Sequence, residues 1–319
     1  MQQRNNCQLS IVNCQFVNKS FGTLEALKNI SFEVSKGEIF GLIGPDGAGK
    51  TTLFRILTSL ILADSGKALV DGLDVVKDYT ELRKHIGYMP GKFSLYQDLS
   101  VEENLNFYAT IFNTTIQENY HLIKDIYQHI EPFKNRRAGK LSGGMKQKLA
   151  LSCALIHKPK VLFLDEPTTG VDPVSRKEFW EMLRKLKEDG ITIVVSTPYM
   201  DEANLCDRIA LIQSGQIFTI DTPENIVKQF KKKLFMVKSD NNYLLLEQLR
   251  NNPQVESVFM FGDNLHVTFN GQLTIENGQL ILDNIKNNCQ LSIINCQFSE
   301  IQPSVEDCFI AFNLNSKSN

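Results

Sequence analysis

The sequence has little excess charge of either sign, because 34 lysine and arginine residues nearly balance 36 aspartate and glutamate residues, for a formal charge of −2. This balance gives no overall basic field, which argues against a nucleic-acid partner. The sequence also lacks a run of roughly 18 uninterrupted apolar residues, so no membrane-spanning helix is predicted, and its start lacks the order of a secretory signal. We therefore expect a cytoplasmic protein in which any phosphate site is local.

Cysteine is sparse, with seven residues, an odd number, and no spacing typical of a zinc site. Because no export signal accompanies these cysteines, disulfides are not expected. Four of the seven fall in a repeated phrase, NNCQLSIVNCQF at residues 5–16 and NNCQLSIINCQF at residues 287–298, and a related phrase covers residues 271–284. We interpret these segments as inserted repeat sequence without a chemical role, with an edge hairpin or a partner contact as the alternative.

The chain has 319 residues, of which 42% are hydrophobic, and this is enough for about two folded domains. A strand-rich opening as far as Gly72 precedes a helical stretch and then alternating strands and helices to about Phe230, which predicts a parallel sheet covered by helices. The tail predicts a small α+β domain, with strands at 234–237, 255–261 and 265–269 and helices at 243–251 and 304–312. The predicted boundaries are an extension at 1–16, a main domain at 17–230 with a helical subdomain at about 92–158, and a C-terminal domain at 231–319 interrupted by a repeat-like insertion at 271–298.

A glycine-rich loop follows the apolar residues 39–43 and precedes an amphipathic helix, which is the context that a phosphate-binding loop requires. Its glycines let backbone N–H groups surround a phosphate, while Lys50 reaches the terminal phosphates and the Thr51 hydroxyl can bind Mg²⁺. Because strand, loop, Lys-Thr pair and helix occur in the right order, a fortuitous glycine-rich turn is the weaker interpretation. The candidate nucleotide-binding residues of the loop are Gly44, Pro45, Asp46, Gly47, Ala48, Gly49, Lys50, Thr51 and Thr52.

A second apolar run, residues 161–164, ends in the acidic pair Asp165 and Glu166. A buried strand with this ending delivers its carboxylates to the carboxyl edge of a parallel sheet. Asp165 can hold Mg²⁺ through water, and Glu166 can polarise an attacking water as a general base. An isolated Asp-Glu pair is usually just solvated, but the upstream phosphate loop makes Glu166, together with Lys50, a candidate catalytic residue.

Two further segments lie on either side of the acidic pair: LSGGMKQ at residues 141–147 opens a helix after a loop, and Gly-Val-Asp-Pro occupies residues 170–173. With these segments and the phosphate loop, residues 16–230 resemble the ATP-binding cassette (ABC) family. The resemblance implies a P-loop α/β fold with an antiparallel β subdomain and a helical subdomain. It also implies a head-to-tail dimer in which each ATP lies between one subunit's phosphate loop and the other's LSGG serine. The residues implied at that interface are Ser142, Gly143, Gly144 and Asp172.

The resemblance assigns Phe21 to stacking on adenine, a contact that needs a flat aromatic face, with a buried core phenylalanine as the alternative. Two positions that matter for hydrolysis depart from the family pattern, and a third, Asp46, stands where asparagine is common and adds a negative charge that a loop position can point into solvent. Gly91 stands where the family usually has a glutamine that contacts Mg²⁺ and the attacking water, and Pro198 stands where it usually has a histidine that contacts the γ-phosphate. Because phosphoryl transfer depends on positioning and charge stabilisation, these departures predict a loss of hydrolysis rate rather than of ATP binding at the chain's own site.

The resemblance implies the ATPase subunit of a bacterial ABC exporter of multidrug type, held at the inner face of the cell membrane by separate multi-span permease subunits. ATP and Mg²⁺ are the expected cofactors. The chain's own ATP site lacks the family's glutamine and histidine, whereas Ser142 and Asp172, which serve the opposite site, are intact. This difference favours a heterodimer with a second ABC ATPase subunit over a homodimer. Two alternatives stay open: a non-hydrolysing regulatory nucleotide-binding subunit, and a soluble ABC ATPase without a transport role.

Overall fold

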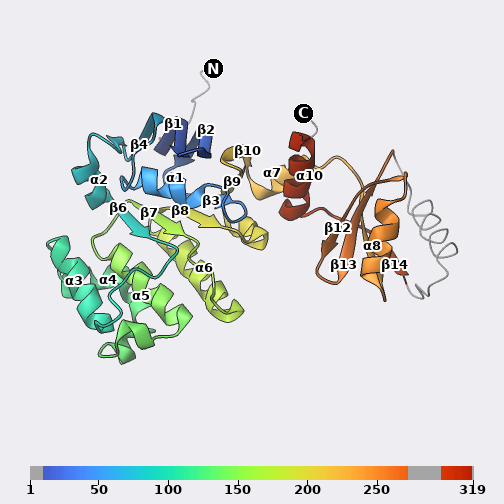
Figure 1. Ribbon diagram of the computed structural model, residues 1–319. Helices are drawn as coiled ribbons and strands as arrows, with labels where there is room; N and C mark the ends of the chain where they lie inside the picture. The colour runs from blue at the N-terminus through green and yellow to red at the C-terminus, as the bar shows by residue number, and fades with distance from the viewer. Residues whose placement is uncertain (1–9, 272–295, 318–319) are drawn as a thin grey trace, which may run out of the picture. The chain divides into compact units, whose positions relative to one another are not determined.

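The computed structural model describes residues 10–271 and 296–317 of the chain (Figure 1). Contacts between residues divide the chain into two compact units, residues 1–223 and 224–319. No helix in the described part of the chain has both the length and the apolar character needed to cross a membrane.

The first unit begins with an antiparallel sheet of strand order β2-β1-β4-β5. Alternation along β1 turns Val12, Cys14 and Val17 into the core, as expected of a sheet with one buried face. The strands of this sheet are β1 (Ser10–Phe21), β2 (Leu24–Ser35), β4 (Ser65–Val70) and β5 (Leu73–Asp74). This is the antiparallel subdomain that the sequence predicts.

A six-stranded sheet of order β10-β9-β3-β8-β7-β6 forms the centre of the first unit, and its strands are parallel except for the edge strand β10. The three strands β3, β7 and β8 are buried at every position, which explains their continuous apolar runs. The six strands are β3 (Ile39–Ile43), β6 (Ile86–Met89), β7 (Val161–Asp165), β8 (Thr192–Thr197), β9 (Arg208–Gln213) and β10 (Gln216–Asp221). The predicted parallel sheet is confirmed.

Helix α1 (Lys50–Leu57) lies between the two sheets (Figure 1). Its Leu53 and Phe54 belong to one buried cluster with residues of both sheets, and the Phe54 ring meets Phe163 of β7 edge to face at 5.7 Å. This packing fixes the start of α1, and therefore the loop before it, against the carboxyl edge of the central sheet. The helices α2 (Tyr79–His85) and α6 (Pro173–Glu188) complete this part of the unit.

Three helices gather into a separate group in Figure 1, namely α3 (Val101–Ile111), α4 (Ile116–Tyr127) and α5 (Gly143–Leu155). A capping box begins α3, in which Ser100 Oγ accepts from Glu103 N while Glu103 Oε2 accepts from Ser100 N. Leu105 and Ala109 of α3 are buried in this helical group. The group occupies the range predicted for a helical subdomain.

The second unit is an antiparallel sheet of order β12-β13-β11-β14 with helices α7, α8 and α10. Leu245 and Leu249 of α8 pack on Phe235, Val258 and Val267 of the sheet to form its apolar core. The elements are α7 (Pro223–Lys228), β11 (Leu234–Ser239), α8 (Asn242–Arg250), β12 (Val255–Phe261), β13 (Asn264–Phe269), β14 (Cys296–Ile301) and α10 (Val305–Lys317). The strands and helices predicted for the tail are present, and β14 is the strand that the sequence did not predict.

The last residues of each repeat copy lie in strands, which differs from the interpretation of these copies as inserted sequence. Residues 10–16, expected in an extension, form the first half of β1, where Val12 pairs with Val34 and Val70. Residues 296–298, expected at the end of an insertion, belong to β14, and Phe298 stacks on the buried Phe235 at 4.8 Å. The remainder of both repeat copies, residues 5–9 and 287–295, lies outside the described residues. Local apolar spacing was too weak in this Asn- and Gln-rich phrase to reveal strands that long-range pairing stabilises.

Candidate functional site

The phosphate loop connects β3 to α1 and encloses the Lys50 side chain. Gly49 has a φ of 105°, and a Cβ added there would lie 2.5 Å from the carbonyl oxygen of Ala26, so only glycine fits. Lys50, which is 3% exposed, donates from Nζ to the carbonyl oxygens of Gly44 at 2.8 Å and Pro45 at 3.0 Å. The loop thus holds a cation inside a ring of backbone, next to the free N–H groups at the start of α1.

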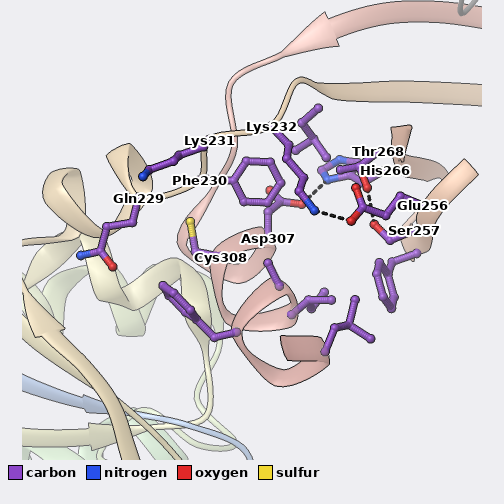
Figure 2. Close-up of a pocket in the computed structure, with 16 residues that line it drawn as sticks. Gln229, Phe230, Lys231, Lys232, Glu256, Ser257, His266, Thr268, Asp307 and Cys308 are labelled. Carbon is purple, nitrogen blue, oxygen red and sulfur yellow. Dashed lines mark hydrogen bonds and ion pairs between the residues drawn. The ribbon is translucent and has the colours of Figure 1, made fainter. Parts of the chain in front are cut away.

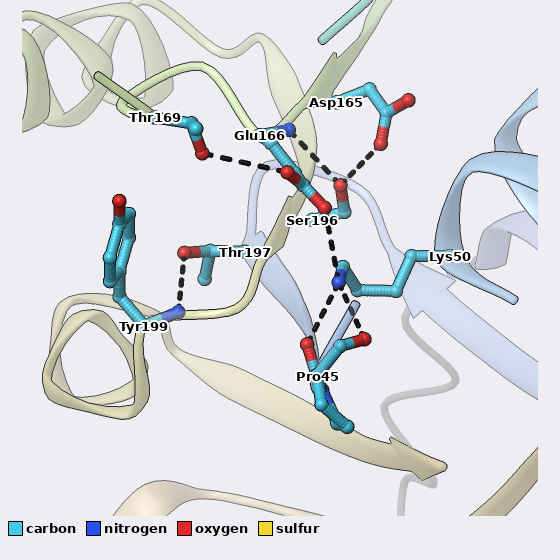
Figure 3. A network of polar contacts seen from close by, with 9 residues as sticks. Pro45, Lys50, Asp165, Glu166, Thr169, Ser196, Thr197 and Tyr199 are labelled. Atoms are coloured by element: carbon cyan, nitrogen blue, oxygen red, sulfur yellow. Dashed lines mark hydrogen bonds and ion pairs between the residues drawn. The ribbon is translucent and has the colours of Figure 1, made fainter. Parts of the chain in front are cut away.

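The acidic pair lies at the carboxyl end of β7, beside the phosphate loop (Figure 3). Lys50 Nζ lies 3.1 Å from Glu166 Oε1, and the side chain of Glu166 is 22% exposed. Glu166 has a φ of 49°, a strained backbone conformation for a residue with a side chain. Two hydrogen bonds from its N–H, to Ser196 O at 3.0 Å and Ser196 Oγ at 3.1 Å, hold it there. The structure therefore brings together Lys50 and the carboxylates that the sequence predicts.

Asp165 is buried, and Ser196 Oγ donates to its Oδ1 at 2.6 Å (Figure 3). Within the described residues, its Oδ2 has no hydrogen-bond partner. Burial and the Asp165 carboxylate raise the pKa of the neighbouring Tyr88 to about 12, so the phenol stays neutral beside the carboxylate. Asp165 Oδ2 is thus available to bind a cation, and the neutral Tyr88 adds no second negative charge beside it.

A magnesium ion fits this donor set. Mg²⁺ prefers oxygen ligands and is usually held through one or two carboxylates together with substrate phosphates and waters. Asp165 supplies one carboxylate, and Thr51 lies in the first turn of α1 with its residue partly exposed. No cluster of three or more His, Cys, Asp or Glu in the described part of the chain could hold a metal. The metal would therefore arrive with the nucleotide, with Asp165 and Thr51 as its protein contacts.

A cavity of about 570 Å³ opens beside the phosphate loop, and Gly47, Gly49 and Thr52 line it together with Phe21. Phe21 is 51% exposed, so it is not the core phenylalanine of the alternative interpretation. Lys19 Nζ lies 5.4 Å from the centre of its ring. The aromatic face is thus presented on the wall of the same cavity whose other wall is the phosphate loop, an arrangement suited to a flat base at one end and phosphates at the other.

The remaining residues of the phosphate loop are either buried in the protein or exposed to solvent. Asp46 is exposed, which keeps the added negative charge away from the loop's interior. Ala48 is buried, and its carbonyl oxygen accepts from Gly215 N at 3.0 Å. The carbonyl oxygen of Gly215 in turn accepts a hydrogen bond from Lys28 N at 2.8 Å, so β2 and the turn after β9 support the loop from behind.

The LSGG segment and the Gly-Val-Asp-Pro segment form a second site away from this cavity. Ser142 caps α5 by accepting from Met145 N at 3.3 Å, and Asp172 caps α6 by accepting from Ser175 N at 3.0 Å. That hydrogen bond lowers the pKa of Asp172. Gly144 packs against Ser175, where an added Cβ would come within 2.7 Å of the hydroxyl oxygen. The two segments therefore lie side by side, with Ser142, Gly143 and Asp172 exposed.

Of the two departing positions, Gly91 adjoins the acidic pair, and Pro198 follows β8 where that strand meets the start of the phosphate loop. A Cβ added to Gly91 would lie 3.0 Å from Asp165 O and 3.7 Å from the Cβ of Glu166. Pro198 follows Thr197 at the end of β8, where Thr197 O accepts from Gly44 N at 3.2 Å. Neither position offers a polar side chain, and Pro198 also has no N–H.

Sequence reasoning missed three residues that shape the site. Ser196 orients both acids, and it could have been found because it directly precedes Thr197 and Pro198. Thr168 Oγ1 donates to the buried Glu202 Oε1 at 2.7 Å, which ties the loop after the acidic pair to the segment after β8. No local pattern announces this contact, since 34 residues separate its partners.

Comparison with known proteins gives the same family for the sequence. Residues 27–169 match the family described as ABC transporter. The probable multidrug ABC transporter ATP-binding protein YbhF of Escherichia coli is 39% identical over 289 residues, which cover 89% of this chain and 48% of that protein. The linearmycin resistance ATP-binding protein LnrL of Bacillus subtilis is 36% identical over 214 residues, covering 66% of this chain and 68% of that protein. This chain thus spans about half the length of YbhF.

Solved structures give the same fold. CbiO1 from Clostridium perfringens, described as part of the ABC transporter complex cbiONQ, superposes with a TM-score of 0.62 at 27% identity, covering 69% of this chain and 91% of that one. The cassette MJ0796, in a dimeric post-hydrolysis state bound to ADP and Pi, has a TM-score of 0.60 at 28% identity, covering 66% and 98%. From the motifs, their geometry and these relatives, the chain belongs to the family of ABC transporter ATPase subunits.

Proposed function

We propose that this chain is an ATPase subunit that binds Mg-ATP at a dimer interface to drive export by separate membrane permease subunits, at the inner face of the membrane, with weak hydrolysis at its own site. The main support for this proposal is that Lys50, Asp165 and Glu166 lie together at one edge of the central sheet. They lie beside a cavity that ends at Phe21. Relatives named for multidrug transport, linearmycin resistance and Nod factor export support the exporter assignment. CbiO1, described as part of a transporter complex, supports separate membrane partners.

In the proposed complex, adenine stacks on Phe21, and the N–H groups of residues 44–52 surround the phosphates. Lys50 pairs with the terminal phosphates, and Thr51 and Asp165 hold Mg²⁺. Mg²⁺ supplies charge neutralisation for the transferred phosphoryl group. Glu166 accepts the proton of the attacking water, and its N–H bonds to Ser196 fix where that carboxylate lies.

The exposed Ser142 and Asp172 support a head-to-tail dimer. Both cap helix N-termini, and the LSGG glycines leave backbone N–H groups at the start of α5, where an anion is favoured. The cavity beside the chain's own phosphate loop does not include them. We propose that they meet the nucleotide held by a second ATPase subunit, as the dimeric form of MJ0796 suggests.

We further propose that the chain's own site is degenerate and that its partner is a different ATPase chain. The position of Gly91 adjoins Asp165 and Glu166, so a longer side chain there would reach the attacking water, and glycine supplies none. Pro198 likewise supplies no donor near the γ-phosphate. Ser142 remains intact for the opposite site, so a partner with a complete set of residues would hydrolyse ATP there.

Steady-state ATPase rates of the assembled complex test this proposal. Ser142→Arg should abolish most turnover, because it blocks the partner's intact site, whereas Glu166→Gln should leave most of the turnover. Glu178→Gln, which removes an exposed carboxylate paired with Lys148, serves as the matched control. Loss of turnover in Glu166→Gln with activity retained in Ser142→Arg would show that hydrolysis takes place on this chain's own phosphate loop.

A second candidate function is a regulatory subunit that binds ATP without hydrolysing it at either site. Gly91 and Pro198 favour it, because neither supplies a polar side chain for phosphoryl transfer. The two functions differ in one measurement. If the assembled complex binds ATP but its turnover does not exceed that of a complex carrying both Ser142→Arg and Glu166→Gln, the chain has the regulatory role.

A further inference from the structure

The sheet of the C-terminal unit has two unlike faces. Side chains alternate along each strand, so Val258 and Val267 point to the core under α8, whereas Ser257 and Thr268 point to the opposite face. On that opposite face the sheet and α10 enclose a cavity of about 500 Å³ (Figure 2). Its volume falls within the range of about 300–1,000 Å³ that small-molecule sites occupy.

One end of this cavity is polar, and its hydrogen-bonding groups come from different elements. Ser257 Oγ and Thr268 Oγ1 lie 2.6 Å apart across β12 and β13. His266 Nδ1 lies 2.7 Å from Asp307 Oδ1 in the first turn of α10. The His266 ring also stacks on Phe261, with centroids 4.0 Å apart and planes 12° from parallel. Figure 2 shows these polar side chains gathered together with Lys232 and Glu256.

The charges at the polar end already have partners. Lys232 pairs with Glu256, and Asp307 accepts from His266 and from both the N–H and the hydroxyl of Ser304. Burial disfavours ionisation of Asp307, but these hydrogen bonds outweigh it and keep its pKa below the usual value. An added ligand charge at this polar end would therefore meet no unpaired opposite charge, since Lys231, the other lysine of the lining, is exposed and is not one of these paired groups. Burying a charge at this end would cost free energy.

A hydrogen-bonding group of a ligand does find partners. Asp307 accepts a hydrogen bond from His266 Nδ1, so the ring keeps Nε2 as a second hydrogen-bonding atom, and Nε2 has no hydrogen bond within the described residues. One of the Ser257 and Thr268 hydroxyls donates to the other, so the pair keeps one further proton to donate and further acceptor capacity. A hydroxyl or an amide can satisfy such a mixed set.

The other walls are apolar and come mostly from α10. Ile310, Ala311 and Leu314 line the cavity on this helix, and Phe259 faces them from β12. Ala311 and Leu314 stand four and seven residues after Asp307, so they continue its face of the helix. The cavity thus runs from polar groups at the start of α10 to an apolar wall along the helix.

We propose that this cavity binds a small neutral amphiphile, with its apolar body along α10 and one uncharged hydroxyl or amide head at His266, Ser257 and Thr268. The site belongs to the C-terminal unit alone and uses none of the residues that bind ATP. It therefore stands whether or not the proposed ATPase function holds.

The test uses the full chain and the neutral fluorophore aminoanthracene as the probe. Its fluorescence should rise saturably at one site per chain. Octanol, octanoate and octyltrimethylammonium share one alkyl chain and differ in head group, so their displacement of the probe isolates the head. Octanol should displace the probe at a concentration about tenfold lower than either charged analogue, because a charged head loses its hydration without gaining a partner.

Substitutions locate the site. Ala311→Trp fills the cavity from α10 and should weaken probe binding at least tenfold, while Lys238→Trp, which places the same ring at an exposed position of β11, should not. Ser257→Leu fills the cavity from the sheet and should also weaken probe binding, so it provides the test if Ala311→Trp fails to fold. Three results overturn the proposal: no saturable probe binding, binding that both folded filling variants retain, or equal displacement by the charged analogues.

Discussion

The contact between Lys50 and Glu166 occupies the lysine that the terminal phosphates of ATP require, so Glu166→Gln should tighten nucleotide binding. The two charged atoms are 3.1 Å apart, with Lys50 3% and Glu166 22% exposed. Two unit charges at this distance attract by about 1 kcal/mol in bulk water and by about 5 kcal/mol at an effective dielectric constant of 20. Because Glu166 is partly hydrated, the lower part of this range applies, and the dissociation constant should fall about tenfold, or about 1.4 kcal/mol.

Calorimetric titration with a non-hydrolysable ATP analogue and Mg²⁺ measures this change without turnover. Lys50→Ala should lose most of the binding, because it removes the cation itself. Glu178→Gln deletes a carboxylate 2.8 Å from Lys148 on the exposed side of α6 and should leave the dissociation constant unchanged. An unchanged or weaker affinity in Glu166→Gln would mean that the carboxylate does not compete with the phosphates, and the reasoning would be refuted.

Three further predictions concern the degenerate site and the C-terminal unit. Gly91→Gln combined with Pro198→His should raise the ATPase rate of the isolated chain at least tenfold, since each positioned group contributes to phosphoryl transfer; an unchanged rate in a folded variant would contradict this. Phe298→Ala should lower the free energy of unfolding by about 2 kcal/mol in urea denaturation, because it removes a half-buried ring stacked on the core. The lowered pKa of Asp307 means that the unfolded chain binds its proton first as pH falls, so the stability it contributes is present above about pH 4 and is lost below it. Asp307→Asn should flatten that part of the pH profile of unfolding, and an unaltered profile would exclude this contribution.

The phosphate loop and the acidic pair could be predicted because each is set by a few consecutive residues. Gly49 must be glycine for a local backbone reason, and Asp165 follows directly from its buried strand. The N-terminal positions of Ser142 and Asp172 on their helices were equally local, since each caps the helix that it precedes. These features need no knowledge of which distant segments meet.

The features that the sequence did not predict depend on contacts between residues that lie far apart along the chain. Ser196 reaches Asp165 only because β7 and β8 are neighbours in the sheet, and His266 reaches Asp307 only because α10 covers β13. The strand β14 was missed for the same reason, since its pairing with β11 brings a polar phrase beside an apolar one. Such contacts follow from topology, which local periodicity does not encode.

The shared ending Cys-Gln-Phe of the two repeat copies creates a problem of timing. Residues 14–16 belong to β1 and residues 296–298 to β14, so the same three-residue sequence forms part of a strand in two different sheets. On the ribosome the first copy meets its partners β2 and β4 by Val70, long before the second copy is made, because translation adds about 5–20 residues per second. In a chain diluted from denaturant both copies are present at once and compete for the same strand edges. During synthesis from the N-terminus, the first copy can therefore pair with β2 and β4 before the second copy exists, although the two copies have the same sequence.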